Sequence, residues 1–354
     1  MNKEFDAKLT NLKHFFFNGS DVRKFIDFLT TKAEVIAPHA KGEKSYSFEV
    51  TENADNVILE YTRTIQPLKK FFLPPVETLL SFKMKSNEFQ EIAIETKKRI
   101  FFGIHSYDMQ GIHRLDYSFE KGKAESNYFK RRENSLFIGI SYKPDEYHFA
   151  KSVGIDIEET DGFALFFLKV ENGYLVFIVT EDGEALIKEF SGGKLIDKPV
   201  KIDEQEQQVK IKYHYNRLPQ VFEHVYDSQV WEQISEKCLG CGTCNLLCST
   251  CYCFDVRDEI ELNVNEGKRQ RFWDGCMLNN FAEVAGGENF REKLSSRTRH
   301  RLYRKFSYIT KSSGELHCVG CGRCSKYCPA DINIVKIINA LIEDFSLQQK
   351  KQAV

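Results

Sequence analysis

Two stretches of the sequence share one cysteine spacing. The first reads Cys238-Leu-Gly-Cys241-Gly-Thr-Cys244-Asn-Leu-Leu-Cys248, and the second reads Cys318-Val-Gly-Cys321-Gly-Arg-Cys324-Ser-Lys-Tyr-Cys328, followed by Pro329. Both are C-x2-C-x2-C-x3-C runs, the spacing with which two-cluster ferredoxins bind 4Fe-4S cubanes. Two-residue gaps let one loop reach three iron corners, and the wider third gap carries the fourth cysteine away. The repeated run therefore predicts two 4Fe-4S clusters.

The same spacing predicts how the eight cysteines divide between the clusters. In two-cluster ferredoxins, the fourth cysteine of each run binds the cluster of the other run. Cluster A is therefore expected on Cys238, Cys241, Cys244 and Cys328, and cluster B on Cys318, Cys321, Cys324 and Cys248. This exchange requires the two runs to fold against each other, although a long segment separates them.

Glycine and proline accompany the runs. Gly240, Gly242, Gly320 and Gly322 stand between the cysteines. Because glycine has no Cβ atom, the backbone can pass close to a cluster there and direct its N–H groups at the sulfur atoms. Pro329 fixes φ where the chain leaves the second run.

A zinc-binding interaction module is the alternative from another class of protein. Zinc needs four ligands, usually supplied as two C-x2-C pairs, and a quartet at this spacing supplies more thiols than one zinc ion uses. Three further cysteines, Cys251, Cys253 and Cys276, lie outside the runs. Buried free thiols are commonly inert packing groups. A third metal centre, which could make the chain an enzyme, is the other hypothesis for these three.

The distribution of cysteine also favours metal binding. All 11 cysteines lie between Cys238 and Cys328. A secreted disulfide scaffold would spread its cysteines through the fold. The N-terminal MNKEFDAKLTNLKHFFF lacks the pattern of a signal peptide, and no apolar run reaches the ~18 residues of a membrane helix. We therefore expect a cytoplasmic protein without membrane insertion. Lys and Arg total 50 against 51 for Asp and Glu, a balance that does not indicate nucleic-acid binding.

Residues 1–225 are predicted to form an α+β domain. The polar pair Ser20-Asp21 is expected to cap a helix over 22–32, and a second helix is expected from Met109. Runs rich in β-branched and aromatic residues predict strands at 46–50, 56–61, 91–95, 99–105, 136–142, 163–170 and 174–180. Turns are expected at 171–173 and 181–183. The 29 phenylalanines predict a core rich in aromatic side chains.

Residues 226–345 are predicted to form a mainly α-helical two-cluster ferredoxin domain, and 346–354 a frayed tail. A helix beginning near residue 222 should lead into Cys238. Asp274 could cap a helix over 276–285 that ends at Gly286-Gly287, and another helix could run over 289–306.

The second of these helices is strongly basic. It carries Arg291, Lys293, Arg297, Arg299, Arg301, Arg304 and Lys305, with Glu292 as its one acidic residue. Three interpretations stay open: a solvated face, cations that raise the potential of an anionic cluster, or a docking face for a partner.

The chain as a whole resembles one family. The resemblance rests on CLGCGTCNLLCSTCYCFDV, RFWDGCMLNNFAEVAGGENFR and CVGCGRCSKYCPADINI, and on residues 61–75 and 103–119 of the N-terminal half. These stretches are similar to the 4Fe-4S dicluster proteins that include the β subunit of NAD(P)-linked nickel–iron hydrogenases, or sulfhydrogenases, and the iron–sulfur component of anaerobic sulfite reductase.

The resemblance implies an electron relay without substrate chemistry of its own. Its partners would be a flavin-containing NAD(P)H oxidoreductase and the terminal subunits of a hydrogenase or, as the alternative, of a sulfite or sulfur reductase. The eight cysteines of the runs would be the cluster ligands, and no catalytic residue is expected. The sequence has no GxGxxG motif opening a strand–turn–helix and no P-loop, so no nucleotide site is expected.

The sequence also departs from that family at three places. Ser249 follows the first run where relatives usually have proline. Ser106-Tyr107-Asp108 and His148-Phe149-Ala150 stand where Pro-Cys-Asp and Cys-Phe-Cys are expected. If those cysteines serve an additional site in relatives, we expect that site to be lost here.

Overall fold

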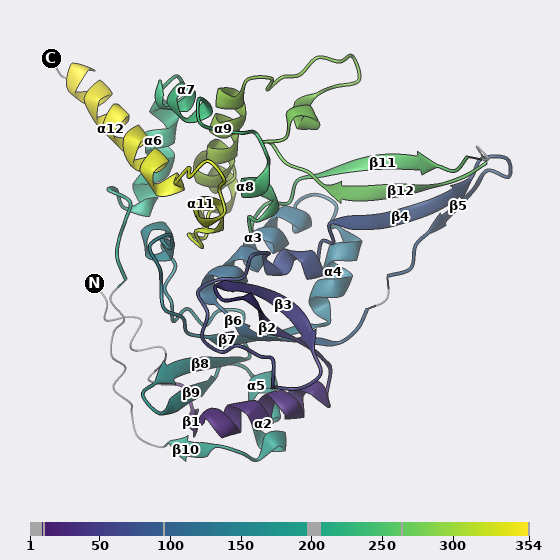
Figure 1. Ribbon diagram of the computed structural model, residues 1–354, viewed down its shortest axis with the longest axis vertical. Coiled ribbons are helices and arrows are strands. Elements are labelled where there is room, and N and C mark those ends of the chain that lie inside the picture. Colours follow the sequence, from purple (N-terminus) through teal and green to yellow (C-terminus); the bar gives the residue numbers. More distant parts are fainter. Residues whose placement is uncertain (1–8, 10, 95, 197–206, 263–264, 353–354) are drawn as a thin grey trace.

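The centre of the protein is an eight-stranded mixed sheet. The computed structural model describes residues 9, 11–94, 96–196, 207–262 and 265–352 (Figure 1). The strand order is β10-β1-β9-β8-β7-β6-β2-β3. The strands are β1 (His14–Phe17), β2 (Glu34–Gly42), β3 (Ser45–Thr51), β6 (Arg99–Ile104), β7 (Ser135–Ile140), β8 (Leu165–Val170), β9 (Gly173–Ile178) and β10 (Lys194–Ile196). β2, β6, β7 and β8 run parallel, and the remaining neighbours pair antiparallel.

Helices cover both faces of this sheet. α2 (Gly19–Thr30) and α5 (Glu181–Phe190) pack on one face, and α3 (Ser106–Glu120) and α4 (Ser126–Glu133) pack on the other. Both layers between sheet and helices are aromatic, as the phenylalanine content predicts: Phe25 and Phe167 lie in the first, and Phe101 and Phe137 in the second. Each fully buried ring contributes about 1.5–3 kcal/mol relative to exposure. The expected mixture of helices and strands is therefore present as an α/β sandwich.

The local predictions succeed in the centre of this sandwich and fail at its margins. β3 and β6–β9 follow the predicted strands closely, and α3 covers the helix expected from Met109. Residues 56–61 form only an isolated bridge through Val57, and of 91–95 only Glu91 lies in a strand; residue 95 lies outside the described residues. The expected turn at 181–183 is wrong, because the Thr180 hydroxyl accepts a hydrogen bond from Gly183 N (3.4 Å) and starts α5. Asn18, earlier in the chain than the predicted cap, caps α2.

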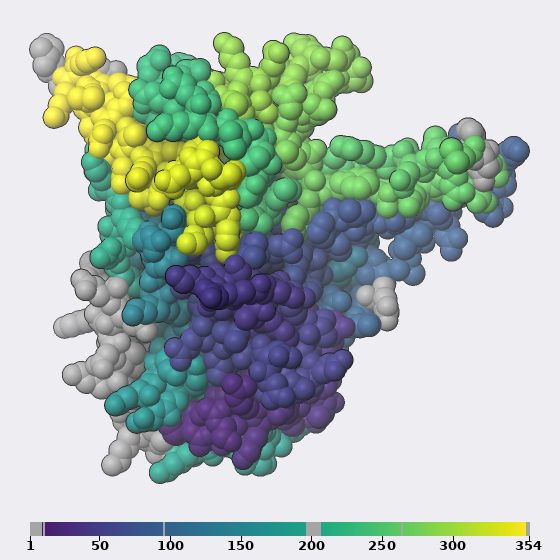
Figure 2. All heavy atoms as spheres, viewed as in Figure 1, coloured from purple at the N-terminus to yellow at the C-terminus, as the bar shows by residue number. Residues whose placement is uncertain are grey.

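A second sheet forms an arm that extends from the body (Figures 1 and 2). Its strands β4 (Val76–Lys83), β5 (Glu88–Glu91), β11 (Phe254–Ile260) and β12 (Glu266–Trp273) pair antiparallel in the order β11-β12-β4-β5. Two hairpins far apart in the sequence thus build one sheet. The prediction for 226–345 did not include the β11–β12 hairpin. In the structure, that segment is helical with this β-hairpin inserted.

The remaining helices surround the two cysteine runs. They are α6 (Leu218–His224), α7 (Val230–Ser235), α8 (Thr243–Leu246), α9 (Leu294–Tyr303), the π-helical turn η5 (Arg304–Tyr308), α10 (Thr310–Ser313), α11 (Arg323–Lys326) and α12 (Ile334–Gln352). Their shared core also contains Tyr107, Tyr142 and Phe149 from the N-terminal half. The expected helix into Cys238 is divided into α6 and α7, and Trp231 Nε1 donates to Val225 O (2.8 Å) at the break.

The helix expected behind Asp274 is absent. The Asp274 carboxylate does accept a hydrogen bond from Gly275 N (2.6 Å), but Asn245 Oδ1 accepts one from Met277 N (3.0 Å). A side chain from the first cysteine run therefore takes the N–H group, and only the 3-10 turn η4 (Asn279–Ala282) follows. The next helix starts at Leu294 rather than residue 289. α12 continues as helix to Gln352, beyond the expected end of the domain. In the described residues, no helix is both long and apolar enough to cross a membrane.

Candidate iron–sulfur site

The two cysteine runs have the same backbone conformation. Gly240 and Gly320 both have φ of 64°, and Gly242 and Gly322 have φ of 73° and 75°. Only glycine adopts this left-handed region without steric cost, which explains the glycine at each position. A short helix follows in each run, and these two helices, α8 and α11, contact each other. The two runs therefore form a paired unit, as the exchange hypothesis requires.

A cavity between the runs collects the thiols predicted for cluster A. It is lined by Cys238, Cys241 and Cys244 of the first run and by Cys328 of the second, with Cys324 also reaching it. The Cys238 sulfur accepts a hydrogen bond from Gly240 N (3.5 Å). The backbone thus directs an N–H group at a ligand sulfur, as the glycine positions predict.

The charge of Cys248 acts on two thiols of the second run. Burial raises the pKa of the Cys318 thiol, and the charge of Cys248 raises it further. Burial likewise raises the pKa of Cys321, again with a contribution from Cys248. Cys248 therefore lies within electrostatic reach of two thiols predicted for cluster B, and the exchange of ligands stays a prediction.

The donor set fits a polynuclear iron–sulfur group. Burial raises the pKa of Cys244 to about 12, so a bound metal must supply the positive charge that holds this sulfur as a thiolate. Within the part of the chain that the structure describes, no three His, Cys, Asp or Glu side chains converge on a single metal ion. A cubane distributes its four thiolates over four iron atoms, so its ligands need not meet at one point.

Comparison with known proteins identifies the family. Residues 237–332 match a family described as a 4Fe-4S dicluster domain. Sulfhydrogenase 2 subunit beta of Pyrococcus furiosus is 36% identical over 329 residues, which cover 90% of this chain and 96% of that protein. The chain belongs to the sulfhydrogenase beta-subunit family of 4Fe-4S proteins. No solved structure matches it. This dicluster protein binds two 4Fe-4S clusters and transfers electrons.

The basic helix of the dicluster protein directs part of its charge at the clusters. Arg297, Arg301 and Lys305 follow one another at four-residue intervals and are buried. Arg301 Nη2 donates to Cys244 O (3.2 Å), and Lys305 Nζ donates to Thr250 Oγ1 (2.6 Å). Burial alone would lower the pKa of Lys305, but the Cys248 and Cys251 thiols raise it above its ordinary value. Arg301 and Lys305 therefore lie where they stabilise negative charge on the clusters, whereas Arg297 donates to Met277 O (3.1 Å).

The rest of the basic run points elsewhere. The Arg299 guanidinium lies 3.9 Å from the Tyr226 ring centroid, and its side chain is half-buried. Arg304 lies over Tyr252. The sequence could not separate these roles, because α9 and η5 had to be placed against the runs first.

A buried ion pair joins both runs to the N-terminal half. The Arg323 guanidinium donates to both carboxylate oxygens of Asp108 (2.7 and 2.8 Å), and both side chains are fully buried. Ser249 Oγ accepts from Arg323 (2.9 Å) and donates to Asp108 (3.2 Å). The serine that replaces the usual proline thus completes this network. Nearby, Arg63 Nε donates to Cys321 O (3.0 Å) and the guanidinium pairs with Asp145. Sequence reasoning missed Arg63, Asp108 and Arg323 as supports of the site.

The three cysteines outside the runs come together. Asn245 Nδ2 lies 3.8 Å from Cys251 Sγ and 3.5 Å from Cys276 Sγ. Hydrogen bonding with Cys253 holds the pKa of Cys251 well below its usual range. Lys69 Nζ donates to Cys251 O (3.1 Å) and lies over the Trp273 ring. The sequence leaves two hypotheses for these thiols, inert packing or a third metal centre. The structure places them as one packed group, and Cys251 acts electrostatically on Cys248.

Aromatic side chains occupy the positions where relatives are expected to have cysteine. The rings of Tyr107 and His148 lie 5.0 Å apart, and Tyr142 Oη bonds to His148 Nε2 (2.8 Å). Ala150 packs in the same core. The rings at positions 107 and 148 thus pack together, and the loss of a site there stays a prediction.

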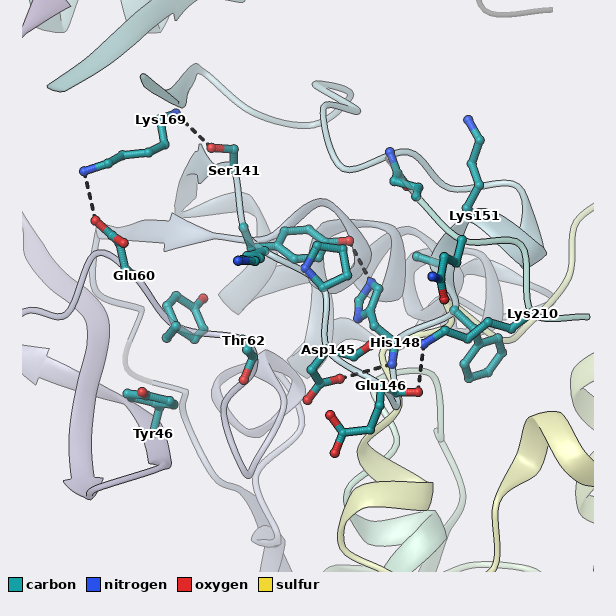
Figure 3. A pocket seen from close by; sticks show the side chains of 18 of the residues that line it. Tyr46, Glu60, Thr62, Ser141, Asp145, Glu146, His148, Lys151, Lys169 and Lys210 are labelled. Atoms are coloured by element: carbon teal, nitrogen blue, oxygen red, sulfur yellow. Dashed lines mark hydrogen bonds and ion pairs between the residues drawn. The ribbon is translucent and has the colours of Figure 1, made fainter. Parts of the chain in front are cut away.

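A separate open cavity of about 820 Å³ lies beyond the C-terminal ends of β7 and β8 (Figure 3). Its lysines are mostly satisfied by the protein itself. Lys169 pairs with Glu60 (2.9 Å), and Lys210 donates to the carbonyls of Asp145 (3.0 Å) and Glu146 (2.7 Å). The loop that forms one wall also packs against the second run, because Phe149 N donates to Gly320 O (2.9 Å). The cavity therefore borders the second run without presenting these two lysines to an anionic ligand.

Proposed function

We propose that this chain relays electrons through its two clusters between a flavin-containing NAD(P)H oxidoreductase and a terminal catalytic subunit of hydrogenase type. The observation that carries the proposal is the paired arrangement of the two cysteine runs in a chain that matches, along nearly its whole length, a sulfhydrogenase beta subunit. Two adjacent clusters provide a conduction path, and the chain itself performs no substrate chemistry. The same relay could serve a sulfite or sulfur reductase, and the terminal subunit that copurifies distinguishes the two.

We further propose the ligands of each cluster. Cluster A is held by Cys238, Cys241, Cys244 and Cys328, and cluster B by Cys318, Cys321, Cys324 and Cys248. The cavity lined by Cys328 together with the first run supports the first set. The electrostatic proximity of Cys248 to Cys318 and Cys321 supports the second.

The proposed functional unit is the segment 226–345, a mainly α-helical two-cluster ferredoxin domain from which the β11–β12 hairpin projects. Residues 1–225 are its α/β support. The frayed tail expected from residue 346 is wrong as far as Gln352, because α12 continues through these residues as helix. We also propose a cytoplasmic location, because the NAD(P)H pool and the reducing conditions that keep 11 thiols unpaired are found there.

Anaerobic purification tests the relay directly. The isolated chain should hold about eight irons and eight sulfides, two cubanes' worth. It should neither bind nor oxidise NAD(P)H, and its visible absorbance should bleach with NAD(P)H only after the flavoprotein is added. Stoichiometric zinc with little iron would refute the clusters. Tight NAD(P)H binding by the chain alone would refute the relay role, and about twelve irons would assign a third centre to Cys251, Cys253 and Cys276.

A further inference from the structure

The two faces of the arm differ in chemistry. Cross-strand pairing aligns Ile260 with Gly267, Gly267 with Phe82, and Phe82 with Phe89. Because side chains alternate between the faces of a sheet, this row lies on one face of the arm tip. Met84 and Leu262 lie in the turns that follow β4 and β11. The intervening positions carry Ser81, Lys83, Glu88, Gln90, Glu259 and Lys268. The tip is therefore an amphipathic sheet. Its apolar face is defined here as Phe82, Met84, Phe89, Ile260 and Leu262.

Four of the five side chains of the apolar face are exposed, and Phe82 is buried at the centre of the row. Phe89 is 69% exposed, Met84 60% and Ile260 53%. Among the described residues, seven of the seventeen exposed large apolar side chains lie on the arm, although the arm is a small part of the chain. An antiparallel sheet buries its apolar face against a second layer, and exposed apolar patches of this kind mark interaction sites.

The base of the arm is fixed to the body, so the tip is held in a defined position. The Glu77 carboxylate pairs with Arg131 (2.5 Å) and with Arg271, and Arg271 also pairs with Glu125 (3.0 Å). Trp273 Nε1 donates to Leu73 O (2.8 Å). These contacts lie at the root of the arm, whereas the tip stands clear of the body (Figures 1 and 2). The uncovered face is thus presented by a rigid support.

We propose that the apolar face of the arm tip binds another protein of the redox complex, an inference that rests on the proposed function. β11 begins directly after Cys253, so the arm continues the segment that follows the first cysteine run. A partner bound to the arm would therefore be joined to the cluster region through β11. The five side chains fall short of the roughly 800 Å² that each partner buries in a standard interface. The arm therefore acts as one clamp of a larger contact.

Charge favours a different protein over a second copy of this chain. Around the tip, acidic residues outnumber basic ones: Glu88, Glu91, Asp258, Glu259, Glu261 and Glu266 against Lys83, Lys85, Lys268 and Arg269. Two tips facing each other would bring like charge together, which opposes association. The matching surface is an apolar patch edged by basic side chains.

The test uses the tagged full-length chain purified anaerobically, with its bound subunits, from its own organism. Phe89→Asp and Ile260→Asp place a charge on the apolar face, and Gln90→Asp places the same charge on the opposite, exposed face as a matched control. We expect native mass spectrometry to show at least a tenfold loss of one partner protein in Phe89→Asp and Ile260→Asp, and less than a twofold change in Gln90→Asp. All variants should keep the wild-type iron content, which separates this result from a failure of the relay itself.

A photo-crosslinking residue at position 89, with position 90 as its control, provides a second measurement that does not weaken the contact. Crosslinking to a different subunit from position 89 alone supports the proposal. Unchanged subunit content in Phe89→Asp and Ile260→Asp overturns it. So does a wild-type chain that carries both clusters yet purifies without partners, or a crosslink to a second copy of this chain.

Discussion

At the scale of single residues, the site depends on charges that the cysteine pattern does not contain. Lys305 and Arg301 are buried beside the runs, while Arg299 of the same basic segment is half-buried and lies over Tyr226. A 4Fe-4S cluster with four thiolates is anionic, and adding an electron makes it more so. A nearby cation therefore stabilises the reduced form and raises the potential.

Lys305→Gln should lower the potential of cluster B. Among the thiols, Cys248 and Cys251 act most strongly on the Lys305 ammonium, so its loss removes positive charge beside that cluster. We expect a shift to more negative potential on the order of 60 mV, a tenfold change in a one-electron equilibrium, in an anaerobic redox titration followed by electron paramagnetic resonance. Arg299→Gln is the matched control and should leave both potentials unchanged. Equal shifts in the two variants would contradict a local role for Lys305.

At the scale of elements, the two runs act as one unit through exchange of their last cysteines. Cys248→Ala should damage cluster B, and Cys328→Ala should damage cluster A, because Cys328 lines the cavity of the first run and Cys248 acts electrostatically on thiols of the second. Spectra that resolve the clusters make the comparison, with Cys318→Ala and Cys238→Ala as references. If Cys248→Ala resembles Cys238→Ala instead of Cys318→Ala, each run closes its own cluster and exchange is wrong.

At the scale of the whole molecule, we expect the three hydrophobic cores to respond differently to loss of the clusters. Two of them lie on the faces of the eight-stranded sheet and contain no cysteine among their described residues, whereas the third contains Cys321 with Cys318 and Cys324 packed against it. Cluster binding contributes folding free energy where ligands come from separate segments. Removal of iron with a chelator should therefore loosen the helices around the runs first.

Hydrogen exchange of the iron-free chain measures this effect. Amides in α9 and α12 should lose protection, while those in β6, β7 and β8 should keep most of theirs. The cluster-loaded chain in the same buffer is the control. Simultaneous loss of protection in the sheet and in the helices would show that all three cores unfold together, and would contradict this division.

What the sequence alone determined is local chemistry. The cysteine spacing predicts two clusters because a cubane is bound mainly by one short loop, and the structure adds the glycine conformations that the spacing implies. Strands such as β7 and β8 were predictable because buried β-branched and aromatic runs are short and continuous. Each of these signals is confined to one short stretch of consecutive residues.

The tertiary structure alone decided the features that join distant segments. Asp108 and Arg323 pair across most of the chain, and β4 pairs with β12 to form the arm. The helix expected behind Asp274 was lost because Asn245, a residue from another segment, bonds to Met277 N. A sequence shows which groups can donate, accept or carry charge. Only folding decides which of them meet, because burial makes an unpaired group costly wherever its partner lies in the chain.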